Sequence, residues 1–166
     1  MEMLKRLFRN GFVIPGAVER HFRPDSLKRI EQAIERSETT HFGESRFIVE
    51  SHLPFWDIVR KKTSMRRALE VFSLYRVWDT EQNNGVLIYF LLADHDFEVL
   101  GDRGIHQYIG QDGWEKICLE MERMIRTGDF EGGVIYGIEK ITEVLAEHFP
   151  ANGANENELS NKPIIL

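Results

Sequence analysis

The chain has 166 residues, enough for one domain with a modest hydrophobic core. Its formal net charge of −6 disfavours nucleic acid as a partner, because nucleic-acid-binding faces are basic, whereas it permits cation binding. No apolar run reaches the length of a transmembrane helix. One cysteine, Cys118, excludes an internal disulfide, fits a reducing compartment, and is expected to be a core thiol on an apolar helix face. We therefore expect a cytoplasmic protein.

Residues 1–23 are predicted to form an N-terminal arm. Apolar residues recur there at helical spacing: Leu4, Leu7 and Phe8. Basic residues that would interrupt a signal-peptide core lie beside them: Lys5, Arg6 and Arg9. A segment of this kind can pack on the domain or lie on a membrane surface. Packing on the domain is the favoured interpretation, because one short amphipathic turn buries little apolar area in lipid.

Residues 24–150 are predicted to form the folded domain. Apolar residues at helical spacing, together with capping and terminating residues, indicate four helices, at 24–40, 64–77, 112–127 and 131–148. Asp112 is expected to be the N-cap of the third helix. Runs rich in β-branched and aromatic residues predict three strands, at 46–52, 85–92 and 97–101.

The run from Val86 to Leu92 dominates the pattern. It is continuously apolar and rich in β-branched and aromatic residues, which is typical of a strand buried on both faces. A buried helix is the alternative, but Gly85 before the run and the polar loop 94–96 after it favour a strand. A second β-rich run, 97–100, follows that loop, so the sequence predicts an antiparallel hairpin.

The order of the elements predicts the topology of the sheet. A strand, a helix and a second strand form a crossover unit over 46–92, so the first two strands should be parallel neighbours. The third strand should be antiparallel to the second. The predicted fold class is α/β, a three-layer α/β/α sandwich with a small mixed central sheet. Residues 151–166 are polar and rich in asparagine, and we expect them to be a disordered tail.

This topology gathers polar residues at one edge of the sheet, where the first two strands begin and the third ends. Arg46 and Arg103 are expected there. Carboxylate and amide oxygens from separate loops suit a hard divalent cation, and carboxylates gathered without a cation would repel one another. The candidate metal ligands are Glu44, Asp79, Asn84, Asp102 and Asp112.

Simpler roles stay open for these residues. Asp79 and Asp102 can end strands and form turns, Glu44 can form an ion pair with a nearby arginine, and Asp112 can be a helix cap alone. The sequence has no EF-hand loop, paired-histidine motif, cysteine cluster, glycine-rich phosphate loop or nucleophile elbow. The motifs therefore indicate no particular reaction.

Five short motifs occur in order over roughly residues 25–150: Gly43-Glu44, Trp78-Asp79-Thr80, Asn84-Gly85-Val86-Leu87-Ile88-Tyr89, Asp102-Arg103-Gly104-Ile105 and Phe130-Glu131-Gly132-Gly133-Val134. Together they resemble the TPM domain, also called the TPM phosphatase domain. The resemblance implies an α/β/α sandwich with a polar edge at Glu44, Asn84, Asp102 and Asp112. Plant thylakoid members of that family are acid phosphatases, and some bacterial members bind calcium or magnesium.

This sequence departs from the family pattern in two ways. Many members carry an acidic residue just before the position of Asn84, where this chain has Asn83. Many also have a signal peptide and a membrane anchor, neither of which is recognisable here. The missing charge should weaken cation binding, and the family's usual location does not transfer.

Two functions are consistent with these observations. The favoured one is a divalent-cation-binding interaction module that holds calcium or magnesium and contacts a protein partner, because no nucleophile or general base is recognisable. The alternative is a metal-assisted phosphatase that hydrolyses a phosphomonoester. In that case Asp102 and Arg103 are the catalytic residues, the arginine holding the phosphate oxygens of the phosphorylated substrate.

Overall fold

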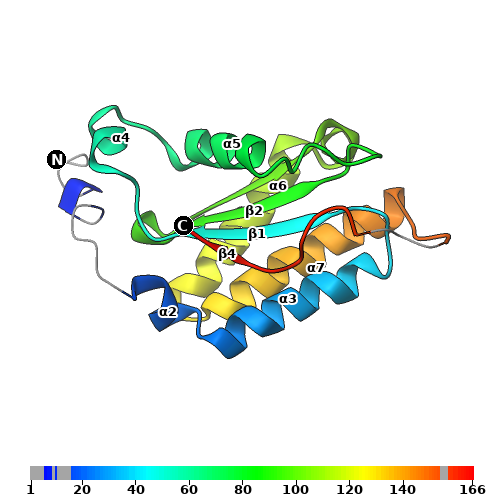
Figure 1. Cartoon of the computed structure of the whole chain (residues 1–166), viewed down its shortest axis with the longest axis horizontal. Helices are drawn as coiled ribbons and strands as arrows, with labels where there is room; N and C mark the ends of the chain where they lie inside the picture. The colour runs from blue at the N-terminus through cyan, green and yellow to red at the C-terminus, as the bar shows by residue number, and fades with distance from the viewer. Residues whose placement is uncertain (1–5, 9, 11–15, 154–156) are drawn as a thin grey trace.

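The computed structural model describes residues 6–8, 10, 16–153 and 157–166. A four-stranded sheet of order β3-β2-β1-β4 forms its middle layer (Figure 1). The central strand β2 pairs in parallel with β1 and antiparallel with β3, which confirms the predicted topology. The strands are β1 (Ser45–Glu50), β2 (Val86–Leu91), β3 (Asp96–Gly101) and β4 (Ile164–Ile165).

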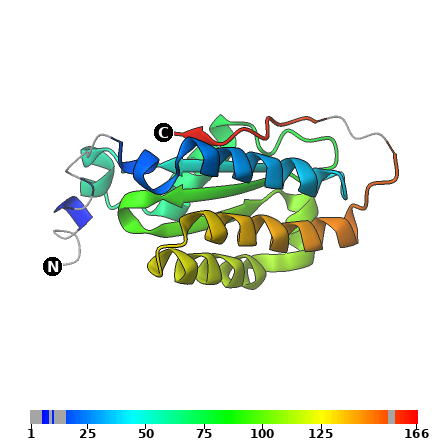
Figure 2. The same cartoon turned by 90° about the horizontal axis from the view of Figure 1, so that it is seen from below.

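Helices cover both faces of the sheet, so the predicted α/β fold with helices on both sides is confirmed. Three long helices lie side by side on one face (Figure 2): α3 (Pro24–Glu38), α6 (Arg103–Arg126) and α7 (Phe130–His148). The short α2 (Ala17–His21) packs on that face as well, and α4 (Phe55–Val59) and α5 (Ser64–Leu74) cover the other. No described helix is long and apolar enough to cross a membrane.

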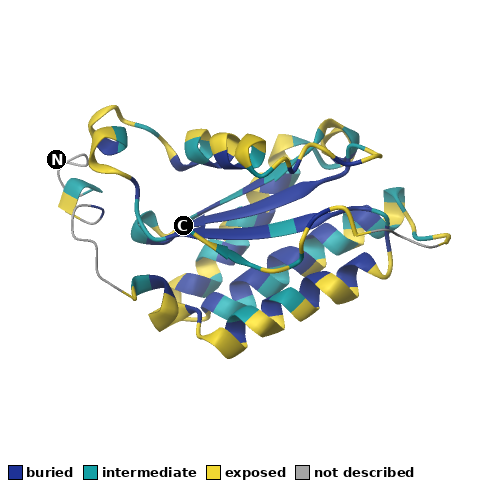
Figure 3. Cartoon of the chain, in the orientation of Figure 1, coloured by how far each residue is buried: buried dark blue, intermediate teal, exposed yellow. Residues whose placement is uncertain are grey.

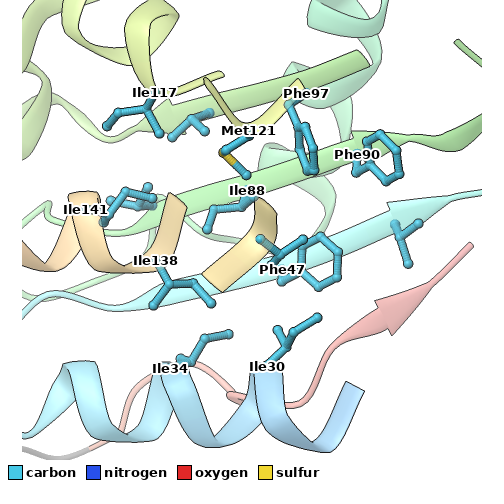
Figure 4. Close-up of a cluster of buried hydrophobic side chains, with 14 of the residues drawn as sticks. Ile30, Ile34, Phe47, Ile88, Phe90, Phe97, Ile117, Met121, Ile138 and Ile141 are labelled. Carbon is cyan, nitrogen blue, oxygen red and sulfur yellow. The ribbon is translucent and has the colours of Figure 1, made fainter. Parts of the chain in front are cut away.

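β2 is buried along its whole length, as its continuous dark colour in Figure 3 shows. Its alternate residues face different cores, because successive side chains of a strand point to opposite faces. Ile88 and Phe90 pack with the three long helices (Figure 4), whereas Leu87 and Tyr89 pack beneath α5. The strand predicted from the apolar run is therefore confirmed.

Helix α6, which contains the helix predicted at 112–127, begins earlier than the sequence suggests. Asp102, not Asp112, is the N-cap of α6, with its Oδ1 accepting a hydrogen bond from the backbone N of Arg103 at 2.7 Å. The helix bends at Gly110, where φ is 66°, and Asp112 lies exposed just beyond the bend. The cap prediction for Asp112 is wrong, because the backbone of Gly110 (φ 66°, ψ 176°) interrupts the helix and helical geometry resumes directly after it, which leaves Asp112 inside the first turn of the second part.

The tail contains a strand that its composition concealed. Ile164 pairs in parallel with Ile48, and the backbone N of Leu166 donates to the carbonyl of Val49 at 2.9 Å. The prediction of a disordered tail is therefore wrong for this segment. The apolar residues at 164–166 form an edge strand, although the asparagine-rich stretch before them is typical of disorder.

The described part of the N-terminal arm lies on the domain. Val18 and Phe22 are buried in the core beneath α3 and α7. The guanidinium of Arg6 pairs with the Asp94 carboxylate at 2.6 Å, and Asn10, 1% exposed, donates to the same carboxylate at 3.0 Å. Leu7 packs against the core on the α5 side, and Phe8 is 63% exposed. Three residues of the predicted amphipathic pattern lie outside the described residues: Leu4, Lys5 and Arg9.

Leu87→Ala should lower the free energy of unfolding by about 2–5 kcal/mol, because it opens a cavity beneath α5 at a fully buried position. Denaturant unfolding measures the change. Leu69→Ala on α5 is the control: its side chain is 52% exposed, so the same substitution should alter stability by about 0.5 kcal/mol or less. Equal losses in the two variants would contradict the double-sided burial of β2.

Candidate functional site

The starts of β1 and β2 and the end of β3 meet at one edge of the sheet. The backbone N of Val86 donates to the Glu44 carbonyl at 2.8 Å, and the backbone N of Asp102 donates to the Gly85 carbonyl at 2.9 Å. A Cβ on Gly85 would lie 1.9 Å from the carbonyl oxygen of Val77, so glycine alone permits this approach of the loop after α5. The strand ends therefore converge as the topology predicts.

Three side chains at this edge each carry a buried oxygen that has no hydrogen-bond partner among the described residues: Oε1 of Glu44, Oδ1 of Asn84 and Oδ2 of Asp102. Their other polar atoms are engaged. Glu44 Oε2 accepts from the backbone N of Leu159 at 3.0 Å, and Asn84 Nδ2 donates to the carbonyl of Phe42 at 3.1 Å. A buried oxygen without a donor costs free energy unless a proton, water or a cation satisfies it. Two carboxylates and an amide are oxygen donors that suit a hard cation.

The electrostatics of the edge disfavour negative charge. Glu44 is fully buried, and burial raises the pKa of its carboxyl group. Burial, with a smaller contribution from the neighbouring Glu44, raises the pKa of Glu38 to about 8. Among the described residues, neither carboxyl has an ion-pair partner. A proton or a bound cation is therefore needed to offset their charge.

The tail covers these carboxyl groups. Besides the bond from Leu159 to Glu44, the Asn161 side chain donates to Glu38 Oε2 at 2.6 Å. The backbone N of Ser45 donates to the other Glu38 oxygen at 3.0 Å. Sequence reasoning missed Glu38, Leu159 and Asn161. The apolar end of the tail was the one signal that could have placed this segment on the sheet.

Two arginines lie near the edge without pairing with Glu44. Arg46 lies on the α5 side of β1, where its guanidinium is 5.7 Å from the Tyr75 ring centroid. Its Nε is buried and has no hydrogen-bond partner within the described ranges. Burial lowers the pKa of Arg46. Arg103 is exposed and donates two hydrogen bonds to Oδ1 of Asn83, at 3.1 and 2.9 Å. Within the described residues, the ion pair that the sequence left open for Glu44 is not formed.

Two of the predicted ligands lie apart from the others. The Asp79 side chain is 56% exposed, with its carboxylate 3.9 Å from the Arg76 guanidinium, and Asp112 is exposed on α6. In the part of the chain that the structure describes, no three His, Cys, Asp or Glu side chains are grouped so that they could hold a metal ion. Glu44, Asn84 and Asp102 therefore remain the candidates at the edge, whereas Asp79 and Asp112 are exposed apart from it.

The buried Glu38 carboxyl predicts that stability falls as pH rises. Its folded-state pKa is about 8 against an ordinary value of 4.5. Between these values the folded protein keeps a proton that the unfolded chain loses, so the free energy of unfolding declines across this interval. The raised pKa of Glu44 acts in the same direction.

Glu38→Gln should flatten this decline, because glutamine keeps the shape of the side chain but cannot ionise. Denaturant unfolding at a series of pH values measures the slope. Glu139→Gln, at an exposed position on α7, should retain the parent slope. An unchanged slope in Glu38→Gln would show that Glu38 is not the group responsible.

Comparisons with known proteins agree with this architecture. Residues 19–144 match the family model of the TPM domain. The chain is similar to the BA42 protein from the psychrophilic bacterium Bizionia argentinensis, known by NMR. The identity is 30% and the TM-score 0.75, with 86% of this chain and 93% of that chain covered.

A second NMR structure, the N-terminal domain of a protein from P. gingivalis, matches with 14% identity and a TM-score of 0.59. It covers 85% of this chain and 95% of that chain, and this likeness supports the fold alone. A search of curated proteins found no match. The family model spans most of the described domain, as does the likeness to BA42. The chain therefore belongs to the TPM domain family.

Proposed function

We propose that this TPM-domain protein binds a divalent cation, calcium or magnesium, at the edge formed by Glu44, Asn84 and Asp102. The observation that best supports the proposal is that each of these side chains has a buried oxygen without a hydrogen-bond partner in the described part of the chain. A cation bound by these oxygens would satisfy them and offset the two negative charges. Water alone would satisfy the oxygens but leave the carboxylates uncompensated.

The donor set also suggests which cation is preferred and how tightly it binds. Calcium takes about six to eight oxygen ligands in flexible geometry, whereas magnesium demands a near-octahedral arrangement and keeps several waters. Two carboxylates and one amide leave the other positions to backbone carbonyls and water. Asn83 cannot add a charge, and its Oδ1 already accepts from Arg103. We therefore expect calcium to be preferred, with modest affinity because ligand charge is low.

Binding without catalysis is the function that these residues support best. Among the described side chains at the edge, Ser45 has a buried hydroxyl, but no base is hydrogen-bonded to it. The hydroxyl oxygen of Thr80 accepts a hydrogen bond from the backbone N of Asn84, a contact that stabilises the loop before β2. An activated nucleophile needs a base within hydrogen-bond reach, and the edge offers none to either hydroxyl.

Asp102→Asn should weaken calcium binding, because a hard cation loses a charged oxygen while the side chain keeps its shape and its capping ability. Calcium and magnesium titrations followed by NMR locate the affected residues. Thermal unfolding with and without excess calcium measures the stabilisation, since a ligand bound only to the folded state raises its stability. The cation-free variant should be as stable as the parent or more stable, because repulsion with Glu44 is relieved.

Asp79→Asn is the matched control, since it removes the same charge from an exposed side chain in the neighbouring loop. It should leave the calcium-induced shift unchanged. Equal shifts in the parent and in Asp102→Asn would remove Asp102 from the site. Equal weakening by both substitutions would indicate non-specific attraction instead of coordination.

A metal-assisted phosphatase is the second candidate, and Arg46 is the observation that favours it. Its guanidinium lies on the same side of β1 as Glu44, and no described residue forms a hydrogen bond with its buried Nε. A phosphate oxygen is a natural acceptor for such a group. Arg103 is exposed next to Asp102 and could hold a second oxygen. In that mechanism a bound cation would supply Lewis acidity, and the arginines would orient the phosphate.

Arg46→Gln separates this candidate from cation binding alone. If a phosphate ester binds, inorganic phosphate with magnesium should raise the thermal unfolding temperature of the parent and raise it less in the variant. Hydrolysis of p-nitrophenyl phosphate by the parent should require magnesium and be reduced in both Arg46→Gln and Asp102→Asn. A parent protein without magnesium-dependent hydrolysis, tested beside a known phosphatase, would exclude this activity on simple phosphomonoesters.

A further inference from the structure

We propose that α4 and the turn that follows it form a docking surface for an anionic lipid bilayer. This surface, the α4 patch, consists of Phe55, Trp56, Val59, Arg60 and Lys61. α4 follows the end of β1, whereas the candidate cation site lies where β1 begins. Figure 1 accordingly shows α4 at the opposite end of the molecule from the start of β1. The patch is therefore independent of the proposed cation site.

The apolar residues of the patch face outward. Phe55, Trp56 and Val59 are 55%, 67% and 42% exposed, whereas Ile58, 1% exposed, anchors the helix in the core beneath it. The rings of Phe55 and Trp56 meet edge to face, with their centroids 5.4 Å apart. Two adjacent aromatic side chains are thus held at the surface on a short helix that is itself fixed to the domain.

Unpaired cations adjoin these aromatic side chains. The side chains of Arg60 and Lys61 are exposed and form no hydrogen bond or ion pair within the described residues. The next residue, Lys62, differs, because its ammonium pairs with Asp57 at 3.0 Å and with Glu70 at 2.9 Å. The acidic side chain of α4 is therefore neutralised, and the patch keeps a positive charge.

The backbone holds the cations beside the aromatic side chains. Lys61 has a φ of 57°, so the chain reverses directly after α4, and the backbone N of Lys62 donates to the Asp57 carbonyl at 2.8 Å. The carbonyl of Lys62 in turn accepts from the guanidinium of Arg6 at 2.6 Å. That contact places the N-terminal segment with Phe8, 63% exposed, near the same end of the molecule.

Charge complementarity identifies an anionic bilayer as the occupant. The whole chain carries −6, so a site with unpaired cations and exposed aromatics is opposite in sign to the molecule as a whole. Tryptophan favours the headgroup region of a membrane, and basic side chains next to it gain from anionic headgroups. A stable protein interface takes about 20–30 residues on each side, many more than this patch provides. A deformable lipid surface needs no matching shape.

Vesicle flotation tests the proposal with the full chain. The parent should bind vesicles of phosphatidylcholine mixed with phosphatidylglycerol, bind pure phosphatidylcholine vesicles much less, and release in high salt. Phe55→Ser/Trp56→Ser removes the aromatic side chains, and Arg60→Glu/Lys61→Glu reverses the charge. Arg60→Glu/Lys61→Glu should lower the partition coefficient by about tenfold or more, since each basic residue near an anionic surface contributes about fivefold. Phe55→Ser/Trp56→Ser should also lower it, because the variant loses apolar area that would be buried in the bilayer. All four positions are exposed, and circular dichroism verifies that the variants fold.

The controls carry matched changes on the other face of the sheet. Lys28→Glu/Lys116→Glu makes the same change in net charge on α3 and α6, and Leu119→Ser removes an apolar side chain that is 60% exposed. Both should bind anionic vesicles as the parent does. A parent that does not bind anionic vesicles overturns the proposal, and so do patch variants that bind like the parent or controls that lose as much binding. A dimer in solution that Phe55→Ser/Trp56→Ser abolishes, without vesicle binding, would assign the patch to a second copy of the chain instead.

Discussion

The burial of β2 on both faces is the constraint on which the rest of the structure depends. A strand without exposed side chains needs a layer of helices on each side, and a central position in which both edges are paired. β1 and β3 supply those pairs, one parallel and one antiparallel. Parallel β1 and β2 require a crossover connection, which runs through α5, whereas antiparallel β2 and β3 can be joined by a short hairpin. The three-layer architecture therefore derives from one seven-residue apolar run and the chain that covers it.

The same pairing creates the candidate site. Parallel β1 and β2 begin at one edge, and antiparallel β3 ends there, so the register places Glu44 and Asp102 on the two sides of Gly85. Most buried polar atoms in folded proteins have a hydrogen-bond partner, yet three side-chain oxygens at this edge have none among the residues that the structure describes. Local rules that are broken together at one place are typical of functional sites. The surrounding sheet is stable enough to offset the cost of these oxygens without hydrogen-bond partners among the described residues.

The sequence predicted much of the sheet topology and part of the candidate site. The apolar run, the glycine before it and the polar loop after it predicted the hairpin, and the crossover predicted which strand ends would meet at Glu44 and Asp102. The sequence did not predict that Glu38 and Leu159 belong to the edge. Their positions there depend on pairing between β4 and β1, which are far apart in sequence, and the composition of the tail predicted disorder. Asp112 failed as a cap for a local reason. The left-handed φ of Gly110 breaks the helix two residues earlier, a conformation that glycine adopts readily, so the second part of α6 has already begun at Asp112.

The tail's position over the edge has a consequence for the dynamics of the protein. Its contact with Glu44 joins residues 115 positions apart, and β4 has only two residues and lies at the edge of the sheet. Short edge elements with few buried contacts open by local unfolding at a lower free energy than the central strands. Each such opening would admit water to Glu38 and Glu44, whose raised pKa values depend mainly on burial. Opening of the tail and release of protons are thus one coupled equilibrium, so amide hydrogen exchange of the tail should report on the ionisation of the edge.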